Sequence, residues 1–410
     1  MASERKNYRM DENHCQEIRD KVESIYRLQT HSPKFGMKKH ILTILALSAF
    51  LSIARADELD KLLPVRGFCI EAPRANGLNE FIAFVNDELA PRHVNTLILR
   101  VDYNYQYESH PEVRDGTGLS KADVKKLVEV CHTNHIRLIP QINLLGHQSW
   151  AKTTFGLLRS HPEFDETPQV KTENYTNWPN SDGLYCKSYC PLHPELHAIV
   201  FDLIDEVCDT FESDAFHAGM DEVFYIGHDK CPRCSGRDKA ELFAGEVRTL
   251  RDHLAQKNRQ LWIWGDRLID GKTTGIGEWE ASYNNTHRAI DMVPKDIMIC
   301  DWHYDRPDQT PVYFAMKGLN VITCPWRNPK IAVLQTQDMV KFRDRATKEM
   351  KPRYQGMMQT VWSGAGGFLE NDYKGNGTNA NNPWTTFKAM SDEWEKLKNS
   401  QTENKQKETK

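Results

Sequence analysis

The sequence has little net charge and no hydrophobic run long enough to cross a membrane as a relaxed helix. Its 410 residues include 53 Lys and Arg against 57 Asp and Glu, which leaves a formal net charge of −4. This near-balance argues against a polybasic nucleic-acid-binding protein and against an acidic disordered one. The longest apolar run, residues 41–53, is shorter than the ~20 residues that a membrane span requires. We therefore expect neither a nucleic-acid partner nor a stable membrane span.

Two further features are missing. No G-x-G-x-x-G follows the first predicted strand and no other nucleotide-binding motif occurs, so no cofactor is expected. No internal repeat or low-complexity linker divides the chain, which favours one large domain. Aromatic side chains are plentiful, by contrast, with 10 Trp and 14 Tyr. Tryptophan-rich proteins often bind flat ligands such as sugar rings by stacking.

Residues 37–56 have the pattern of a secretory signal peptide. Met37 is followed by Lys38 and Lys39, then by the apolar run 41–53, and residues 54–56 match the A-x-A cleavage pattern. We expect cleavage after this pattern and export to the periplasm or the extracellular space. Residues 1–36 are then a mis-called or disordered extension before the true start at Met37. An uncleaved signal anchor or a buried helix is the alternative.

Two close cysteine pairs suggest a structural cross-link. Cys186 and Cys190 are separated by three residues, and Cys231 and Cys234 follow further along the chain. Such pairs suit a structural zinc site or two disulfides, with disulfides slightly favoured in an exported protein. Scattered buried thiols are the alternative. Ten cysteines in all leave nine after residue 56, so at least one thiol has no partner within the chain.

After residue 56 the sequence alternates apolar β-branched runs with amphipathic segments. The predicted strands are Val65–Glu71, Val94–Val101, Ile136–Ile142, Ala215–Gly219, Gln260–Trp264, Asp296–Asp301, Asn320–Cys324 and Gly356–Trp362. The predicted helices are Leu78–Leu89, Lys121–Asn134, Glu195–Phe211, Lys239–Asn258, Asn285–Met292, Pro311–Lys317, Ile331–Met350 and Trp384–Leu397. Eight strands that are apolar on both faces, each followed by a helix, predict an α/β fold, a (β/α)8 TIM barrel over residues 57–395. A doubly wound open sheet is the alternative, and the polar residues 396–410 are expected to form a frayed tail.

In such a barrel the functional residues lie at the carboxyl ends of the strands. Acids, one arginine, histidines and several aromatic residues fall there: Glu71, Arg74, Asp102, Tyr103, Asn143, His147, His217, Asp221, Glu222, Trp264, Asp266, Asp301, Trp302, Tyr304, Trp326 and Trp362. Sugar rings present apolar C–H faces and polar edges, so indoles with carboxylates suit a pyranose site. The sequence therefore predicts a sugar-binding pocket at this end of the barrel.

Asp221 and Glu222 are the candidates for the chemistry. They are adjacent, and they follow a short strand that contains His217. Two neighbours at one strand end cannot approach a sugar ring from opposite sides, as the acid and the nucleophile of a two-carboxylate glycosidase do. They suit substrate-assisted cleavage, in which one acid protonates the leaving oxygen and the other steers a nucleophile that belongs to the substrate.

The segment His217-Ala218-Gly219-Met220-Asp221-Glu222 resembles the H-x-G-G-D-E signature of glycoside hydrolase family 20, the β-N-acetylhexosaminidases. This resemblance implies an exo-acting retaining enzyme that removes terminal N-acetylhexosamine from a glycan or oligosaccharide through an oxazolinium intermediate. It implies that Glu222 is the general acid/base and that Asp221 orients the acetamide and stabilises the intermediate. Neither an enzyme nucleophile nor a metal is required.

The same resemblance assigns residues to substrate binding. Arg74 matches the arginine that grips sugar hydroxyls, and Gly146-His147 resembles the P-G-H after the third strand. The other residues implied to bind substrate or to orient the acids are His217, Trp264, Asp266, Trp302, Tyr304, Trp362 and Glu370. Three of these tryptophans would wall the acetamide pocket, Tyr304 would donate to the acetamide oxygen, and Glu370 would bind a 4- or 6-hydroxyl.

The chain departs from the family pattern in two places. Met220 replaces the second glycine of the signature, so its side chain must point away from the substrate or narrow the site. The small α+β domain that precedes many family barrels has no counterpart before the first predicted strand, which indicates a single-barrel member. Two alternatives stay open: a barrel hydrolase of another linkage with Asp221 or Asp102 as nucleophile, and a non-catalytic sugar-binding barrel supported only by Met220.

Overall fold

The computed structural model describes residues 58–172, 184–375 and 380–408. The predicted signal peptide and the residues before it lie outside these ranges. After a short helix over residues 58–62 the barrel begins at Val65.

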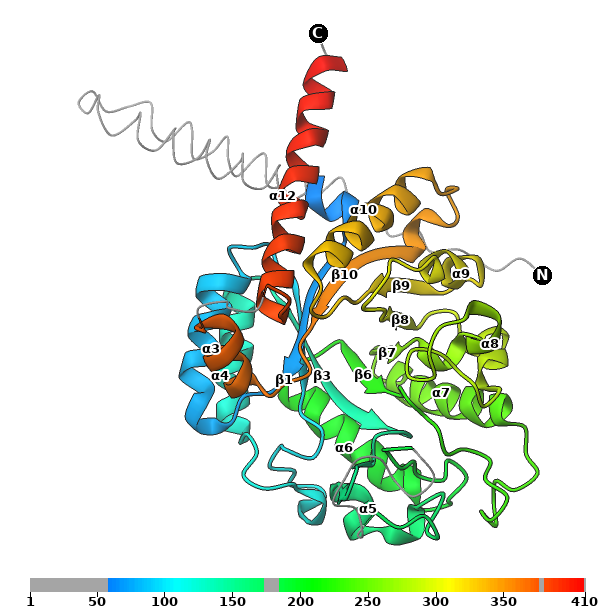
Figure 1. The fold of residues 1–410 in the computed structure, drawn as a ribbon. Helices are drawn as coiled ribbons and strands as arrows, with labels where there is room; N and C mark the ends of the chain where they lie inside the picture. The colour runs from blue at the N-terminus through cyan, green and yellow to red at the C-terminus, as the bar shows by residue number, and fades with distance from the viewer. Residues whose placement is uncertain (1–57, 173–183, 376–379, 409–410) are drawn as a thin grey trace, which may run out of the picture. The chain divides into compact units, whose positions relative to one another are not determined.

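Eight parallel strands close into a barrel, which confirms the predicted (β/α)8 fold (Figure 1). The strands are β1 (Val65–Glu71), β2 (Thr96–Arg100), β3 (Arg137–Leu144), β6 (Ala215–Gly219), β7 (Gln260–Trp264), β8 (Met298–Asp301), β9 (Asn320–Thr323) and β10 (Tyr354–Thr360). Each strand pairs with the next one along the chain, and β10 returns to β1 with Val65 opposite Gly356. Because all pairs are parallel, the carboxyl ends of the strands meet at one mouth of the barrel.

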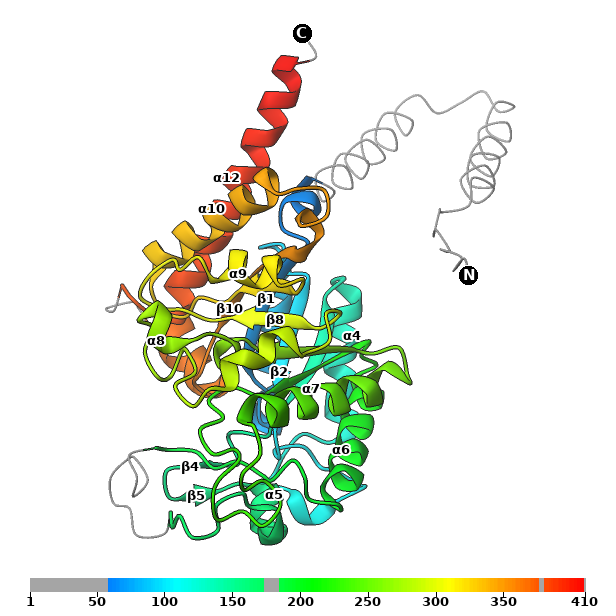
Figure 2. The ribbon, with the colours of Figure 1, turned by 90° about the vertical axis from the view of Figure 1, so that its right-hand side faces the viewer.

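Helices surround this barrel, as Figures 1 and 2 show from two directions. They are α3 (Leu78–Phe84) with η2 (Val85–Leu89), α4 (Lys121–Thr133), α6 (Leu196–Thr210), α7 (Lys239–Ala255), η6 (Thr286–Asp291), α9 (Thr310–Met316), α10 (Pro329–Arg345) and α12 (Pro383–Glu408). Polar caps begin three of them: the side chains of Ser120, Asp238 and Asn328 each accept a hydrogen bond from a backbone N–H of the first turn. These caps satisfy donors that have no partner inside the helix. None of the helices in the described ranges is both long and apolar enough to cross a membrane.

The barrel holds two layers of apolar side chains. Inside it, inward-facing strand residues such as Ile98, Trp262 and Met358 form one cluster. Between strands and helices a larger cluster forms, because the amphipathic helices bury their apolar faces against the strands. Both faces of the strands are therefore buried, which is the reason that apolar residues occur on both faces, interrupted by single polar residues such as Arg66, Gln141 and Gln359.

Two predicted elements differ most from the structure, and the ends of most others are shifted by one to five residues. The helix expected over residues 285–292 is a single 3₁₀ stretch, η6. The expected frayed tail after residue 396 is wrong as far as Glu408, because α12 continues to that residue. Lys, Glu and Gln dominate this stretch, and these residues extend an existing helix readily without apolar periodicity.

The longest connections lie at the mouth of the barrel. The β3–α6 connection contains the short hairpin β4 (Ser149–Trp150) and β5 (Thr153–Thr154), followed by α5 (Gly156–Ser160). Figure 2 shows these elements grouped below the barrel in that view. Residues 220–238 connect β6 to α7. These two connections carry His147, Asp221 and Glu222.

Candidate active site

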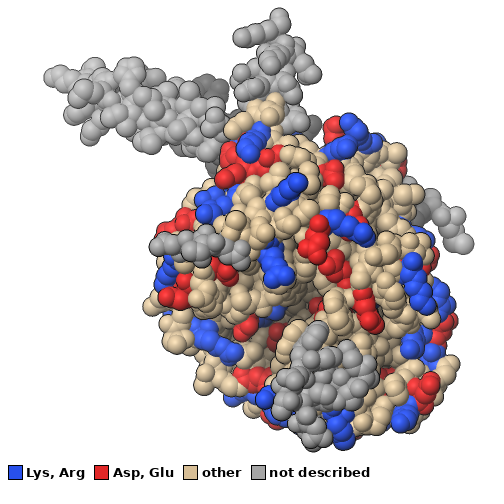
Figure 3. All heavy atoms as spheres, viewed as in Figure 1, with Lys and Arg blue, Asp and Glu red and all other residues tan. Residues whose placement is uncertain are grey.

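A pocket of about 780 Å³ opens at the carboxyl ends of the strands. Carboxylates line it, namely Glu71, Asp102, Asp115, Asp221, Glu222 and Glu280. Aromatic side chains line it as well, namely Tyr103, Trp150, Phe155, Tyr185, Trp279, Trp302, Tyr304, Trp326 and Trp362. Figure 3 shows the hollow in this face, with acidic and basic atoms around it. The predicted combination of acids and indoles is thus present at the mouth of the barrel.

The two adjacent acids stand on a sharp turn directly after β6. Gly219, Met220 and Glu222 have φ angles of 66°, 65° and 49°, in the left-handed region. At Gly219 a Cβ atom would lie 2.3 Å from Asn143 Oδ1, so this position requires glycine. The turn directs the Asp221 and Glu222 carboxylates into the pocket.

Met220 points the other way. Its side chain is fully buried in the apolar cluster between strands and helices and does not line the pocket. The bulky residue in the signature therefore leaves the site open, and the observation that favoured a non-catalytic barrel loses its force.

His147 joins the two acids. Its Nε2 atom lies 3.1 Å from Asp221 Oδ2 and 3.0 Å from Glu222 Oε2. The β3–α6 connection approaches the acid turn closely enough to make this contact only because residue 146 is glycine. A Cβ atom on Gly146 would lie 2.5 Å from the backbone oxygen of Asp221.

The charges at this contact stabilise one another. Burial by itself lowers the pKa of His147, but the Asp221 carboxylate raises that pKa well above its usual value. Burial likewise raises the pKa of Asp221, and the His147 charge outweighs it, so that the Asp221 pKa is lowered. Around neutrality Asp221 is therefore ionised and His147 protonated. The other Asp221 oxygen, Oδ1, is buried without a hydrogen-bond partner among the described residues, so it is available to a ligand N–H.

Gly146 offers a direct test of this geometry. We expect Gly146→Ala to lower kcat/KM at least ten-fold and to lower the melting temperature, because the added methyl group pushes the β3–α6 connection away from the acid turn. Gly245→Ala is the matched control, since a Cβ atom there meets nothing within 4 Å and alanine favours the interior of α7. An unchanged kcat/KM in Gly146→Ala would contradict the requirement for glycine at this contact between the β3–α6 connection and the acid turn.

Three of the predicted residues lie beneath the pocket. Trp264 is fully buried inside the barrel, so its predicted place in the pocket wall is wrong. His217 packs against it with ring centres 4.6 Å apart, and burial lowers the His217 pKa to about 3, which keeps that ring neutral. Asp266 accepts hydrogen bonds from the Glu222 backbone N–H at 2.9 Å and from Trp302 Nε1 at 3.2 Å. It acts as a support for the acid turn and the aromatic wall.

Trp302, Tyr304 and Trp362 line the pocket as predicted. Trp302 and Tyr304 have ring centres 5.2 Å apart, and Trp326 packs edge-on against Tyr304. Trp362 Nε1 donates to the Tyr304 hydroxyl oxygen at 2.6 Å. Since that oxygen already accepts a hydrogen bond, its own proton can be given to a ligand acceptor. Burial raises the pKa of Tyr304 well above its usual value, so the phenol keeps this proton.

Arg74 and Glu370 lie in different places. Arg74 stands at the rim of the pocket, where its guanidinium donates to Asn104 Oδ1 at 2.6 Å. Glu370 does not reach the pocket: its side chain is exposed and lies 3.7 Å from Lys374. After Trp362 the chain forms α11 (Ala365–Gly367) and η8 (Phe368–Tyr373), and these helical turns carry Glu370 to the outer surface.

Several lining residues escaped the sequence prediction. Trp150 and Tyr185 lie in the β3–α6 connection, and Trp279 and Glu280 lie in the connection after β7. Their only sequence signal is that aromatic residues gather in these long connections. Tyr185 and Trp279 meet across the pocket mouth with ring centres 4.9 Å apart.

Glu280 is held by a buried chain of charges. His303 Nδ1 lies 2.8 Å from Glu280 Oε2, and His303 Nε2 lies 3.1 Å from Asp301 Oδ1. Burial lowers the His303 pKa, but Asp301 and then Glu280 outweigh it and raise the pKa to about 10. His303 is therefore a cation that fixes a pocket carboxylate.

This pair of contacts predicts a pH-dependent contribution to stability. Because the folded-state pKa is raised, protonated His303 stabilises the fold fully below about pH 6.5 and loses this effect as the pH rises to about 10. The contribution is roughly 3–5 kcal/mol. Chemical denaturation should show that His303→Gln lowers the free energy of unfolding more at pH 6 than at pH 10. If His303→Gln lowered the free energy of unfolding equally at both pH values, His303 would not carry the assigned positive charge.

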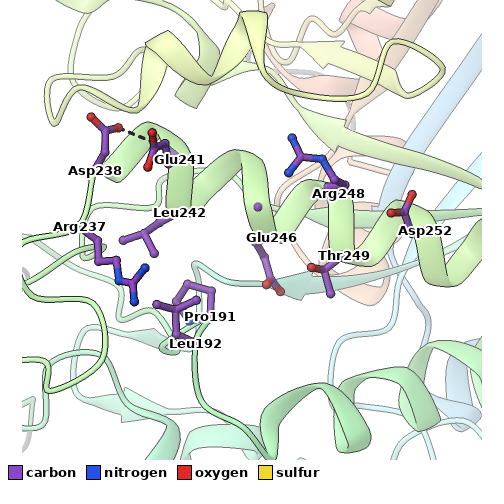
Figure 4. Close-up of a pocket in the computed structure, with 11 residues that line it drawn as sticks. Pro191, Leu192, Arg237, Asp238, Glu241, Leu242, Glu246, Arg248, Thr249 and Asp252 are labelled. Carbon is purple, nitrogen blue, oxygen red and sulfur yellow. Dashed lines mark hydrogen bonds between the residues drawn. The ribbon is translucent and has the colours of Figure 1, made fainter.

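A second cavity, of about 340 Å³, lies against α7 (Figure 4). Its Glu246 carboxylate is already engaged, accepting from the Tyr189 hydroxyl at 2.7 Å and contacting His197 Nε2 at 2.9 Å. These contacts join α6, α7 and the connection before α6. Glu246 therefore has a structural role here.

The nine cysteines that the structure describes are all free and buried, so the favoured disulfides are not found among them. Cys186 is apart from the other three cysteines of the two predicted pairs. Its sulfur lies beside the acid turn, 3.4 Å from the backbone oxygen of Glu222. Cys190, Cys231 and Cys234 meet elsewhere.

Comparisons with known proteins agree with this geometry. Residues 92–408 match the model of the catalytic domain of glycosyl hydrolase family 20. A beta-hexosaminidase of Akkermansia muciniphila is 31% identical over 115 residues, which are 28% of this chain and 21% of that protein. Beta-hexosaminidase 1 of Coccidioides posadasii is 24% identical over 72% of this chain and 50% of its own length. The chain thus spans half or less of these relatives.

A solved structure shares the fold. The family 20 exo β-N-acetylglucosaminidase from Vibrio harveyi, in complex with N-acetylglucosamine, superimposes with a TM-score of 0.56 at 14% identity, over 80% of this chain and 54% of that one. A parallel barrel with carboxylates and indoles at its mouth suits a barrel glycoside hydrolase, the class that the family match shows. Within this class, the match over most of the chain shows that the protein belongs to glycosyl hydrolase family 20.

Proposed function

We propose that the protein is an exo-acting β-N-acetylhexosaminidase that removes a terminal N-acetylhexosamine with retention of configuration by substrate-assisted catalysis. The observation that carries this proposal is the contact of Asp221 and Glu222 with the same nitrogen of His147. Both acids come from one turn, so they approach a bound sugar from the same side. Such an arrangement leaves the opposite face of the ring to a nucleophile of the substrate itself.

The site offers one group for each requirement of this reaction. Glu222 would protonate the leaving oxygen. The unpartnered Asp221 Oδ1 would accept the acetamide N–H, and its negative charge would stabilise the positive oxazolinium ring. Tyr304 would donate to the acetamide oxygen that attacks C1. Water would then open the oxazolinium ring, with Glu222 now acting as the base.

The names of the relatives support the same substrate class, since curated β-hexosaminidases from two organisms match the chain. The aromatic wall of Trp302, Tyr304 and Trp362 would hold the acetamide methyl group against apolar surface. Arg74 would bind hydroxyls at the rim. Neither a metal nor a nucleotide is needed for these steps.

A panel of nitrophenyl β-glycosides with and without a 2-acetamido group tests the proposal. We expect turnover of the N-acetylglucosaminide or N-acetylgalactosaminide only, and inhibition by a thiazoline analogue of the oxazolinium ion. Equal turnover of plain glucosides without thiazoline inhibition would instead favour an enzyme nucleophile. Asp221 and Asp102 are then the candidates, because both line the pocket.

Export is part of the proposal and rests on the sequence pattern of residues 37–56. Expression of the full chain in a bacterial host, followed by fractionation and N-terminal sequencing, tests it. We expect a periplasmic or secreted product that begins at Asp57. A membrane-bound product with an intact N-terminus would support the signal anchor, and a cytoplasmic product would overturn export.

A further inference from the structure

Three buried cysteines and one buried glutamate converge outside the active-site pocket. Cys190 lies in the β3–α6 connection, and Cys231 and Cys234 lie in the β6–α7 connection. Glu166, from the β3–α6 connection, completes the group. One sulfur or carboxylate oxygen from each of the four lies within 4.8 Å of the others.

Glu166 supplies evidence that is independent of the sulfurs. Its side chain has no exposed surface, yet only one of its carboxylate oxygens has a partner. Oε1 accepts the backbone N–H of His228 at 2.9 Å, whereas Oε2 has no hydrogen-bond partner among the described residues. Burying an unpaired carboxylate oxygen is costly, so this atom is available to a positively charged ligand.

The spacing of the sulfurs fits shared coordination. Cys190 Sγ lies 3.3 Å from Cys234 Sγ and 3.5 Å from Cys231 Sγ. A disulfide would bring two sulfurs to about 2.05 Å and leave the third thiol alone. Tetrahedral zinc with Zn–S distances near 2.3 Å separates its sulfurs by about 3.8 Å, so small outward movements would admit the ion.

Cys231 and Cys234 lie on consecutive backbone turns of the β6–α7 connection. The N–H of Ser235 donates to the Cys231 carbonyl oxygen and the N–H of Arg237 donates to the Cys234 carbonyl oxygen, each at 3.0 Å. The spacing of Cys231 and Cys234, with two residues between them, is that of a zinc-binding turn.

We propose that this cluster binds one structural Zn²⁺ through Glu166 Oε2 and the thiolates of Cys190, Cys231 and Cys234. The three thiols release their protons to solvent when the ion binds, and no redox step is involved. Four buried protein ligands leave no position for water or substrate, so the site is structural rather than catalytic. It replaces Cys186 of the predicted set with Glu166, a residue that no sequence spacing indicated.

The ion would clamp together the two connections that build the active site. The β3–α6 connection carries His147 and Tyr185, and the β6–α7 connection carries Asp221 and Glu222. Directly after Cys190, Pro191 and Leu192 lie opposite α7 (Figure 4). A cross-link at this point fixes the base of both connections.

Metal analysis of the purified full chain, expressed with added zinc and dialysed without chelator, tests the proposal. We expect about one zinc per chain in the wild type and a loss of most of it in Cys190→Ser and Glu166→Gln. Cys131→Ser is the matched control, because Cys131 is a buried thiol of α4 outside the cluster and should leave the zinc content unchanged. Circular dichroism checks that each variant is folded.

Three measurements on the wild type keep the test decisive if a variant does not fold. Replacement of zinc by Co²⁺ in the wild type should give the visible bands of tetrahedral cobalt together with thiolate charge-transfer bands in the ultraviolet. Intact mass under non-reducing, denaturing conditions should show no disulfide, and chelation should lower the melting temperature of the wild type. A metal-free protein that takes up neither zinc nor cobalt, or a disulfide between cluster cysteines, overturns the proposal. None of these readouts uses a substrate, so they stand apart from the proposed enzymatic activity.

Discussion

Glu222→Gln is expected to reduce kcat/KM for nitrophenyl N-acetyl-β-glucosaminide by about 10²–10⁴-fold, the usual contribution of a positioned general acid. Glutamine keeps the size of the side chain and its contact with His147. It cannot protonate the leaving oxygen. The loss should shrink for a dinitrophenyl leaving group, because a more acidic phenol departs without assistance.

Glu129→Gln is a suitable control for this experiment, since Glu129 is exposed on α4 far along the chain from the acid turn. This variant should leave kcat/KM unchanged for both the nitrophenyl and the dinitrophenyl substrate. If Glu222→Gln retained full activity on the poor leaving group while its melting temperature stayed at the wild-type value, the assignment of the acid would be wrong.

Asp221→Asn is expected to reduce turnover of 2-acetamido substrates by about 10²–10³-fold, because it removes the negative charge that faces the developing oxazolinium ion. The same change removes the carboxylate that raises the pKa of His147, so that pKa should fall. NMR titration of His147 can follow this effect separately from the kinetics. We expect His147 in this variant to lose its proton at a lower pH than in the wild type.

Asp229→Asn provides the comparison, since Asp229 is exposed on the same β6–α7 connection. Loss of turnover of the acetamido substrates at an unchanged melting temperature is the expected outcome, and an unchanged rate would remove Asp221 from the mechanism. If the wild type also turned over plain glycosides, an equal loss on both substrate types would indicate that Asp221 attacks C1 directly.

The barrel could be predicted from the sequence because its strands are buried on both faces. Val65–Glu71 and Ala215–Gly219 coincide in prediction and structure, since continuous apolar runs mark such strands at both ends. The short 3₁₀ helix η6 could not be distinguished from an α-helix, because three or four apolar residues satisfy either pattern. The continuation of α12 depends on intrinsic helix propensity, which the search for apolar periodicity ignores.

The site was predictable where strand ends determine it and not where loops do. The Asp221-Glu222 turn and Tyr304 follow strands directly. Trp264 was misplaced because strand residues alternate: it shares the inward face with Trp262 and fills the last layer of the barrel interior rather than the mouth. Glu280 depends on the path of a long connection, and such a path leaves no periodic signal in the sequence.

The buried thiols have a practical consequence for following motion in this molecule. Burial raises the pKa of both Cys69 in β1 and Cys131 in α4 to about 12, so neither sulfur is a thiolate in the closed structure. An alkylating reagent can therefore modify them only when the surrounding structure opens. The modification rate at Cys131 reports opening of the helical shell, whereas the rate at Cys69 reports opening of the barrel itself. Mass spectrometry of the labelled chain would thus compare the kinetics of these two layers without any added probe residue.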